Sequence, residues 1–137
     1  MLSIPALVLA AALTLQPADT SVIEITFDVG AEDGAVMAAL FDSEGAWDGG
    51  GAPVRAAMIN VAGGDRVARF EGLPPGDYAL RAFHDVNGDG QMNANPFGMP
   101  TEPFAFSNNA VGNMGPASWD RARFAVSGET RQTITLR

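Results

Sequence analysis

The sequence predicts an all-β fold, a single seven-stranded Greek-key β-sandwich with one long irregular loop. Three observations favour this fold class. Apolar and polar residues alternate with a period of two in several short segments, which is typical of strands with one buried face. Sixteen glycines and nine prolines suit short strands joined by tight turns better than long helices. No helical periodicity follows the N-terminal apolar segment, and a length of 137 residues indicates one domain.

The first two strands are expected near the start of this domain. In residues 23–29 every second side chain, beginning with Ile23, is apolar, and polar side chains fall between them. Residues 35–42 are almost continuously apolar, which indicates a central strand that is covered on both faces. The intervening residues 31–33, which precede a glycine, are typical of a hairpin turn.

The rest of the chain is expected to add five strands and their connections. Residues 42–53 predict a Gly-rich loop that carries Trp47, and residues 85–120 predict the long irregular loop. The Ser127-Gly128 turn is expected to close the domain as a hairpin. The five strands are expected at residues 54–61, 66–70, 77–84, 121–126 and 130–136.

The composition narrows the class of partner. The formal net charge is −8, and all eight cations are arginine. Such a chain repels phosphate backbones, so nucleic-acid binding is not expected. An acidic surface attracts divalent cations, although it also serves simple solubility. The sequence has no cysteine, which excludes disulfides, thiolate zinc sites and cysteine nucleophiles.

The N-terminus predicts export. Residues 2–15 are almost entirely apolar and carry no charge, a length that suits a secretory signal and is too short for a stable membrane span. We therefore expect a signal peptide at residues 1–18, a β-sandwich domain at residues 19–137, and a periplasmic or secreted protein. The alternative is that the segment is a buried first strand or an N-terminal helix.

An oxygen-rich loop after residue 84 predicts a calcium site. Oxygen-bearing side chains occupy alternate positions, Gly90 stands where calcium loops turn sharply, and Gln91 would offer a backbone carbonyl. Pro96 stands where such loops place a bidentate Glu. The predicted metal ligands, which include the nearest replacement carboxylate, are Asp85, Asn87, Asp89, Gln91, Asn93 and Glu102. The alternative is an ordinary turn, because Asn-Gly and Asp-Gly are common turn formers.

The long loop carries aromatic residues interleaved with amides, which favours either of two interpretations. The apolar side chains could pin the loop over the sandwich. They could instead form a concave surface for a carbohydrate or another ligand of the cell envelope, with amides as hydrogen-bonding groups. The residues predicted for this ligand surface are His84, Phe97, Phe104, Phe106, Asn108, Asn109 and Trp119.

Catalysis is not expected. No Gly-x-Ser-x-Gly motif occurs, and no serine has an evident base partner in the sequence. The alternative is a hydrolase that uses His84, Asp85 and Glu102 as acid–base groups. The leading expectation is a non-catalytic exported binding or structural module with a loop-stabilising calcium ion.

Two family resemblances accompany these observations. Residues 70–82, a strand, a Pro-Gly turn and a strand opening with Tyr78, resemble a hairpin of transthyretin-like and collagen-binding-type sandwich modules. Over nearly the whole domain the sequence resembles exported bacterial proteins grouped as "domain of unknown function 2141". The segments that carry this likeness are residues 76–79, 83–90, 98–109, 115–120 and 122–124. The resemblance implies a small secreted or periplasmic β-sandwich and brings no established activity.

Overall fold

The computed structural model describes residues 20–136, and the predicted signal peptide at residues 1–18 lies outside the described residues. The described part contains eight strands and three short helical segments. In chain order they are β1 (Ser21–Val29), β2 (Ala35–Phe41), α1 (Glu44–Gly49), β3 (Arg55–Ile59), β4 (Val67–Leu73), β5 (Gly76–Asp85), β6 (Phe104–Phe106), η1 (Ser107–Asn109), α2 (Trp119–Ala122), β7 (Phe124–Val126) and β8 (Glu129–Leu136).

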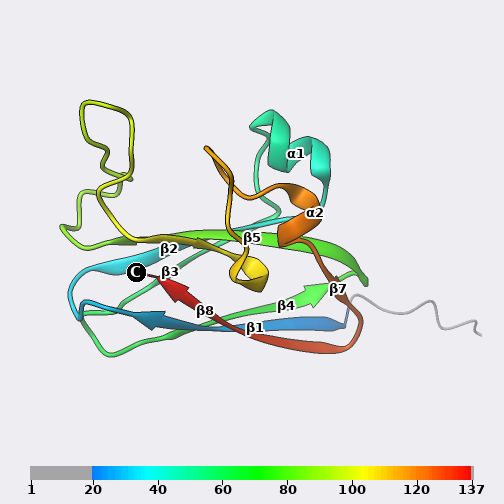
Figure 1. The fold of residues 1–137 in the computed structure, drawn as a ribbon. Helices are drawn as coiled ribbons and strands as arrows, with labels where there is room; N and C mark the ends of the chain where they lie inside the picture. Colours follow the sequence, from blue (N-terminus) through cyan, green and yellow to red (C-terminus); the bar gives the residue numbers. More distant parts are fainter. Residues whose placement is uncertain (1–19, 137) are drawn as a thin grey trace, which may run out of the picture.

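The strands form two sheets that lie face to face (Figure 1). The three-stranded sheet has the order β4-β1-β8, in which β1 is antiparallel to β4 and parallel to β8. The five-stranded sheet has the order β3-β2-β5-β6, with β7 paired to β5. The all-β class is confirmed. The described part has one strand more than the seven predicted, because β6 forms within the stretch that was expected to be irregular.

The inner faces of the two sheets bury one continuous apolar core. Ile23, Ile25 and Phe27 are at most 1% exposed, which confirms the inward face predicted for the first strand. Each such side chain stabilises the fold by about 1.5–3 kcal/mol through burial. The opposite sheet contributes Val36, Leu40 and Leu80 to the same core, among others.

Three turns that were expected to close hairpins instead carry the chain between the sheets. The turns after β1, β4 and β7 each join a strand of one sheet to a strand of the other. A turn motif fixes where the chain reverses but not which strand it then pairs with, and here burial of both apolar faces decides the pairing. At the β4–β5 crossing the Tyr78 hydroxyl donates to the Pro74 carbonyl at 2.6 Å, a tyrosine corner of the kind found in sandwich domains.

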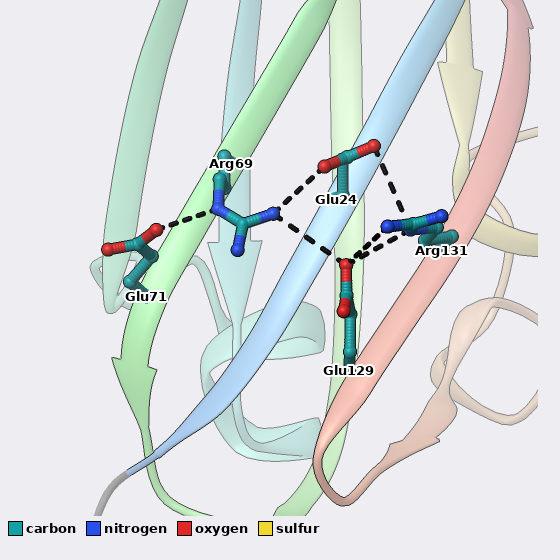
Figure 2. A network of polar contacts seen from close by, with 5 residues as sticks. All are labelled: Glu24, Arg69, Glu71, Glu129 and Arg131. Carbon is teal, nitrogen blue, oxygen red and sulfur yellow. Dashed lines mark hydrogen bonds and ion pairs between the residues drawn. The ribbon is translucent and has the colours of Figure 1, made fainter.

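The outer face of the three-stranded sheet is covered by a network of ion pairs (Figure 2). Arg69 on β4 reaches Glu24 at 2.9 Å and Glu71 at 2.7 Å. Arg131 on β8 reaches Glu129 at 2.8 Å, and this hydrogen bond is the main cause that lowers the pKa of Glu129. The charged groups in the network are therefore paired with one another at the surface.

The outer face of the five-stranded sheet is different, because short helices and a loop lie over it (Figure 1). Beside α1 and α2 a second apolar cluster forms around Trp47 and Trp119, whose ring centroids are 6.4 Å apart. The Trp47 indole donates to the Ala117 carbonyl at 2.9 Å. The predicted loop at residues 42–53 thus contains a helix. A helix of six residues is too short to be stable by itself, so packing in this cluster stabilises it. It is also too short to show a helical pattern in the sequence.

No helix within residues 20–136 has both the length and the apolar character that a membrane crossing requires.

Candidate functional site

The candidate site begins where β5 ends. Asp85 is the last residue of that strand, and the loop that follows lies on the same side of the sheet as α1 and α2 (Figure 1). Gly34 approaches it so closely that an added Cβ would lie 2.0 Å from the Asp85 carbonyl oxygen. Gly34 also has φ +69°, a conformation that glycine adopts at little cost. The position of Asp85 is therefore fixed by close backbone packing.

Three carboxylates meet in this loop. Asp85, Asp89 and Glu102 each offer an oxygen, and these oxygens all lie within 4.8 Å of one another. Glu102 is 17 residues after Asp85 in the chain, so only the fold brings it here. Asp85 and Glu102 are buried, whereas Asp89 is exposed. Because like charges at this separation repel, the arrangement favours a cation among them.

Glu102 is held in the cluster by both of its carboxylate oxygens. One oxygen accepts a hydrogen bond from the Val86 N–H at 2.7 Å, and the other accepts from the Asn93 N–H at 3.1 Å. The side chain thereby joins the beginning and the end of the oxygen-rich loop. The structure thus places Glu102 beside the loop, as the sequence predicted.

Asp89 is kept ionised by its neighbours. Its carboxylate accepts from the Gln91 N–H at 2.9 Å and from the Asn93 side-chain amide at 2.8 Å. The Gln91 hydrogen bond, followed by that of Asn93, lowers the pKa of Asp89. The Asn87 side-chain amide also donates to the side-chain oxygen Oδ1 of Asn93 at 3.2 Å. Together with Glu102, which accepts from the Asn93 N–H, five of the six predicted ligands are therefore linked by hydrogen bonds.

Asp85 has one oxygen in use and one without a partner. Its Oδ2 accepts from the Gly90 N–H at 2.7 Å. Its Oδ1 is buried and has no hydrogen-bond partner among the described residues. The whole residue is only 3% exposed. A buried carboxylate oxygen without a partner costs free energy unless a cation or a donor meets it. The neighbouring carboxylates of Asp89 and Glu102 cannot supply a proton donor when ionised.

His84 is not part of a ligand surface, which corrects one sequence prediction. The residue is fully buried, and its Nε2 lies 2.6 Å from the Asp33 carbonyl oxygen. Because a carbonyl oxygen only accepts, Nε2 carries the proton of this hydrogen bond. His84 therefore ties the turn before β2 to β5. Period-two alternation places His84 on the same face of β5 as Leu80 and Ala82, which are also buried, and this was the signal for its burial.

The other residues predicted for the ligand surface divide into two groups. Phe97 is 89% exposed and Phe104 is partly exposed, so two aromatic rings remain at the surface. Trp119 is buried in the second apolar cluster, which corrects its placement, whereas Phe106 is buried in the same cluster but also lines the hollow described below. The packing of these two rings agrees with the interpretation in which apolar side chains pin the loop over the sandwich.

Asn108 and Asn109 are exposed, but their amides are used within the chain. Asn108 donates to the carbonyls of Arg121 and Arg123 at 3.0 and 2.9 Å. Asn109 donates to the Thr133 carbonyl and accepts from the Thr135 N–H. The Asn108 contacts fasten the segment to α2 and the residue after it. The Asn109 contacts fasten it to β8 and occupy a backbone edge that would otherwise be open to another strand. The two amides are therefore structural, not ligand contacts.

A hollow lies between the connection that follows β5 and residues 114–116. It has a volume of about 1010 Å³ and sits on the outer face of the five-stranded sheet, with β2, β3, β5 and β6 contributing to its lining. Its lining includes Met37, Phe83, Phe97, Met99, Phe104 and Phe106. We call this hollow the sheet groove.

Arg81 is the one charged residue that lines the sheet groove, and it was not among the residues predicted for a ligand surface. It lies on β5 between Leu80 and Ala82, and a charge within the apolar run of residues 78–83 was the signal available. The pattern alone could not show on which face the arginine stands.

A family model described as "Uncharacterized protein conserved in bacteria (DUF2141)" matches residues 23–135. This range runs from β1 into β8 and includes the acidic cluster and the sheet groove. No curated protein and no solved structure matches the chain.

Proposed function

The chain belongs to the DUF2141 family of uncharacterized bacterial proteins, and we propose that it is a non-catalytic exported binding module whose Asp85 loop is held in shape by calcium. The family description supplies no activity, so the proposal rests on the geometry of the loop. The observation that carries it is the buried Asp85 Oδ1, which has no partner and lies in a cluster with Asp89 and Glu102.

Calcium suits this cluster better than the other common metals. All the donors are oxygens, which hard cations prefer, and the chain has no cysteine. Asp85 Oδ1 would coordinate a bound ion, and the positive charge of the ion would relieve the repulsion among the three carboxylates. Amide oxygens of Asn87 and Asn93 and the Gln91 backbone carbonyl are the further candidates for ligands. Neutral oxygens and a partly exposed loop favour weak binding, with Kd on the order of 10⁻⁴–10⁻³ M.

Binding would order the loop that borders the sheet groove. An ion that binds only the folded loop stabilises the folded protein through linkage. That loop contributes Met92 to the lining of the sheet groove, and Phe97 and Met99, which also line it, follow the loop in the same connection between β5 and β6. Calcium would therefore set the shape of a binding surface without taking part in a reaction.

The non-catalytic and exported parts of the proposal have their own support. His84 contacts the Asp33 carbonyl through Nε2, while its buried Nδ1 has no partner among the described residues. Glu102 accepts backbone N–H groups with both oxygens, so each of the two side chains has a structural contact. The hydrolase alternative needs both of them as acid–base groups. Export is supported by the apolar segment at residues 2–15.

The test is calorimetric titration of the protein with calcium, together with thermal melting in calcium and in chelator. The proposal predicts heat of binding and a higher melting temperature in calcium. Asp89→Ala should lose most of the calcium-dependent rise, because it removes the exposed carboxylate of the cluster. Asp65→Ala, which removes an exposed carboxylate between β3 and β4, is the matched control and should keep the rise. Absence of heat, or an equal rise in Asp89→Ala, would contradict the proposal.

A further inference from the structure

Arg81 is a charged residue on an apolar surface. The residues that line the sheet groove are otherwise uncharged, and most of them are apolar. Charged side chains are rarely retained on apolar surfaces unless they have a partner. The chain carries an excess of carboxylates, yet Arg81 makes no ion pair with any of them in residues 20–136. Asp48 attracts it electrostatically without such a contact.

The guanidinium is held in place by aromatic rings and one carbonyl. Its central carbon lies 4.4 Å from the ring centroids of both Phe41 and Trp47. One terminal nitrogen donates to the Trp47 carbonyl at 2.9 Å. The Nε–H is buried and has no hydrogen-bond partner among the described residues. The positive charge is thus fixed in position and is not neutralised by a carboxylate.

We propose that the sheet groove binds a single-chain fatty carboxylate, whose alkyl chain lies along the apolar lining and whose carboxylate meets Arg81. A pocket of about 300–1,000 Å³ is typical of small-ligand sites, and the sheet groove has about 1010 Å³. The apolar lining matches an alkyl chain. A guanidinium matches a carboxylate by paired, charge-assisted hydrogen bonds.

A monocarboxylate fits better than a more highly charged group. Arg81 is the one cation that lines the sheet groove, and it can neutralise one negative charge. A phosphate monoester would bring close to two negative charges at neutral pH into an apolar site with one cation, in a protein of net charge −8. A neutral alkane would leave the charge of Arg81 without an anionic partner.

The proposal does not rest on the calcium site. Arg81 stands on β5, and its aromatic supports come from β2 and α1, which are separate from the oxygen-rich loop. The connection between β5 and β6 that contains this loop supplies one wall of the sheet groove through Phe97 and Met99. Failure of calcium binding would leave the carboxylate contact intact, so each proposal can fail without the other.

The test is titration of the protein with dodecanoate, dodecanol, dodecylamine and dodecyl phosphate, followed by calorimetry and by tryptophan fluorescence. Trp47 is in contact with Arg81, so its emission should change on binding. The proposal predicts that dodecanoate binds about tenfold or more tightly than dodecanol, as expected for a hydrogen bond to a charged group. It also predicts that dodecanoate binds more tightly than the phosphate and the amine.

Variants locate the contact. Arg81→Met keeps an unbranched apolar stem over the two rings and should bring dodecanoate to the affinity of dodecanol. Arg55→Met removes an equal charge from an exposed position on β3 that does not line the sheet groove, and should change neither affinity. Ala56→Trp places bulk in the sheet groove and should weaken the acid and the alcohol alike.

Four results would overturn the proposal. They are no dodecanoate binding, equal binding of dodecanoate and dodecanol, tighter binding of the amine or the phosphate, and an equal loss in Arg55→Met and Arg81→Met. If Arg81→Met fails to fold, Ala56→Trp and the comparison of the four ligands on the unchanged protein still decide the question. Repeating the dodecanoate titration in chelator separates this result from that of the calcium experiment.

Discussion

The outer faces of the two sheets carry opposite kinds of surface. On the three-stranded sheet, Glu24 and Arg69 lie in a network where each charged group has a charged partner (Figure 2). On the five-stranded sheet, Arg81 stands without an ion pair on an apolar face, and the Asp85 carboxylate at the end of the same strand has an oxygen without a partner. Both unpaired charges therefore belong to one strand, β5, and to one side of the molecule.

The difference teaches where binding is to be sought. Exposed, mutually paired charges contribute little stability and keep a sheet face soluble, so the three-stranded face requires no ligand. Buried polar groups without partners call for a physical explanation. A cation at Asp85 and an anion at Arg81 would supply partners for two of the three residues that carry such groups; the third is His84, whose Nδ1 also has no partner among the described residues. The following predictions break or sharpen this comparison between the two faces.

The largest effect is expected from Trp47→Ala. The Trp47 side chain supports α1, contacts Phe41 and Phe106, and stacks with Arg81. Truncating a buried aromatic residue of this kind costs about 3–5 kcal/mol in the free energy of unfolding. Urea denaturation followed by far-UV circular dichroism measures this loss. Arg131→Ala on the opposite face is the comparison and should change the midpoint little; equal losses would show that the two faces do not differ.

The next effect is the calcium dependence of Asp85→Asn, a nearly isosteric change. In chelator the variant should be at least as stable as the unchanged protein, because one of three mutually repelling carboxylates becomes neutral. With calcium at about 100 times Kd, the unchanged protein should gain about 2.7 kcal/mol, and the variant should gain much less. Thermal melting in both conditions tests this. A variant that gains as much from calcium would exclude Asp85 as a ligand.

A moderate effect is expected from Ser107→Ala. The Ser107 hydroxyl is fully buried, donates to the Ala122 carbonyl and accepts from the Leu80 N–H. Removing it leaves these two backbone groups unsatisfied, at a cost of about 1–3 kcal/mol. Chemical denaturation measures the change in stability. Hydrogen exchange should localise the loss to β6 and α2, and a loss spread evenly over both sheets would contradict this account.

The smallest effect is expected from Glu129→Gln on the paired face. Hydrogen bonding to Arg131 holds the pKa of Glu129 below its ordinary value of 4.5. A lowered pKa in the folded state stabilises the protein above the unfolded-state pKa, and the stabilisation disappears as the pH falls through the lowered pKa. The unchanged protein should therefore exceed Glu129→Gln slightly in stability at pH 7. The free energies of unfolding of the two proteins should converge in acid, and denaturation at a series of pH values measures this. A difference in stability that grows in acid would contradict the prediction.

The sequence predicted the fold class and the positions of most strands because burial imposes a period of two on each strand. It also predicted that Glu102 would lie near the oxygen-rich loop, since Pro96 left the loop without a closing carboxylate. Strand pairing was predicted less well. The turn after β7 was expected to form a hairpin, but β7 pairs with β5 and β8 pairs with β1, as the packing of two apolar faces requires.

The binding face could not be predicted in the same way. Phe106 and Trp119 were expected at the surface, but their burial depends on α1, which the Gly-rich pattern of residues 42–53 did not indicate. Arg81 escaped notice because its role depends on which face of β5 it occupies and on what lies above that face. Such properties arise from tertiary contacts, and local sequence patterns do not encode them.

The most direct test of the difference between the two faces is an amide proton–nitrogen NMR titration of the labelled protein, first with calcium and then with dodecanoate. Calcium should shift the amides of residues 85–93 and of Glu102, and dodecanoate should shift those of β2, β3, β5 and β6. The amides of β4, β1 and β8 should move little in either step. Shifts that concentrate around Glu24, Arg69 and Arg131, or no shifts at all, would contradict the assignment of binding to the outer face of the five-stranded sheet.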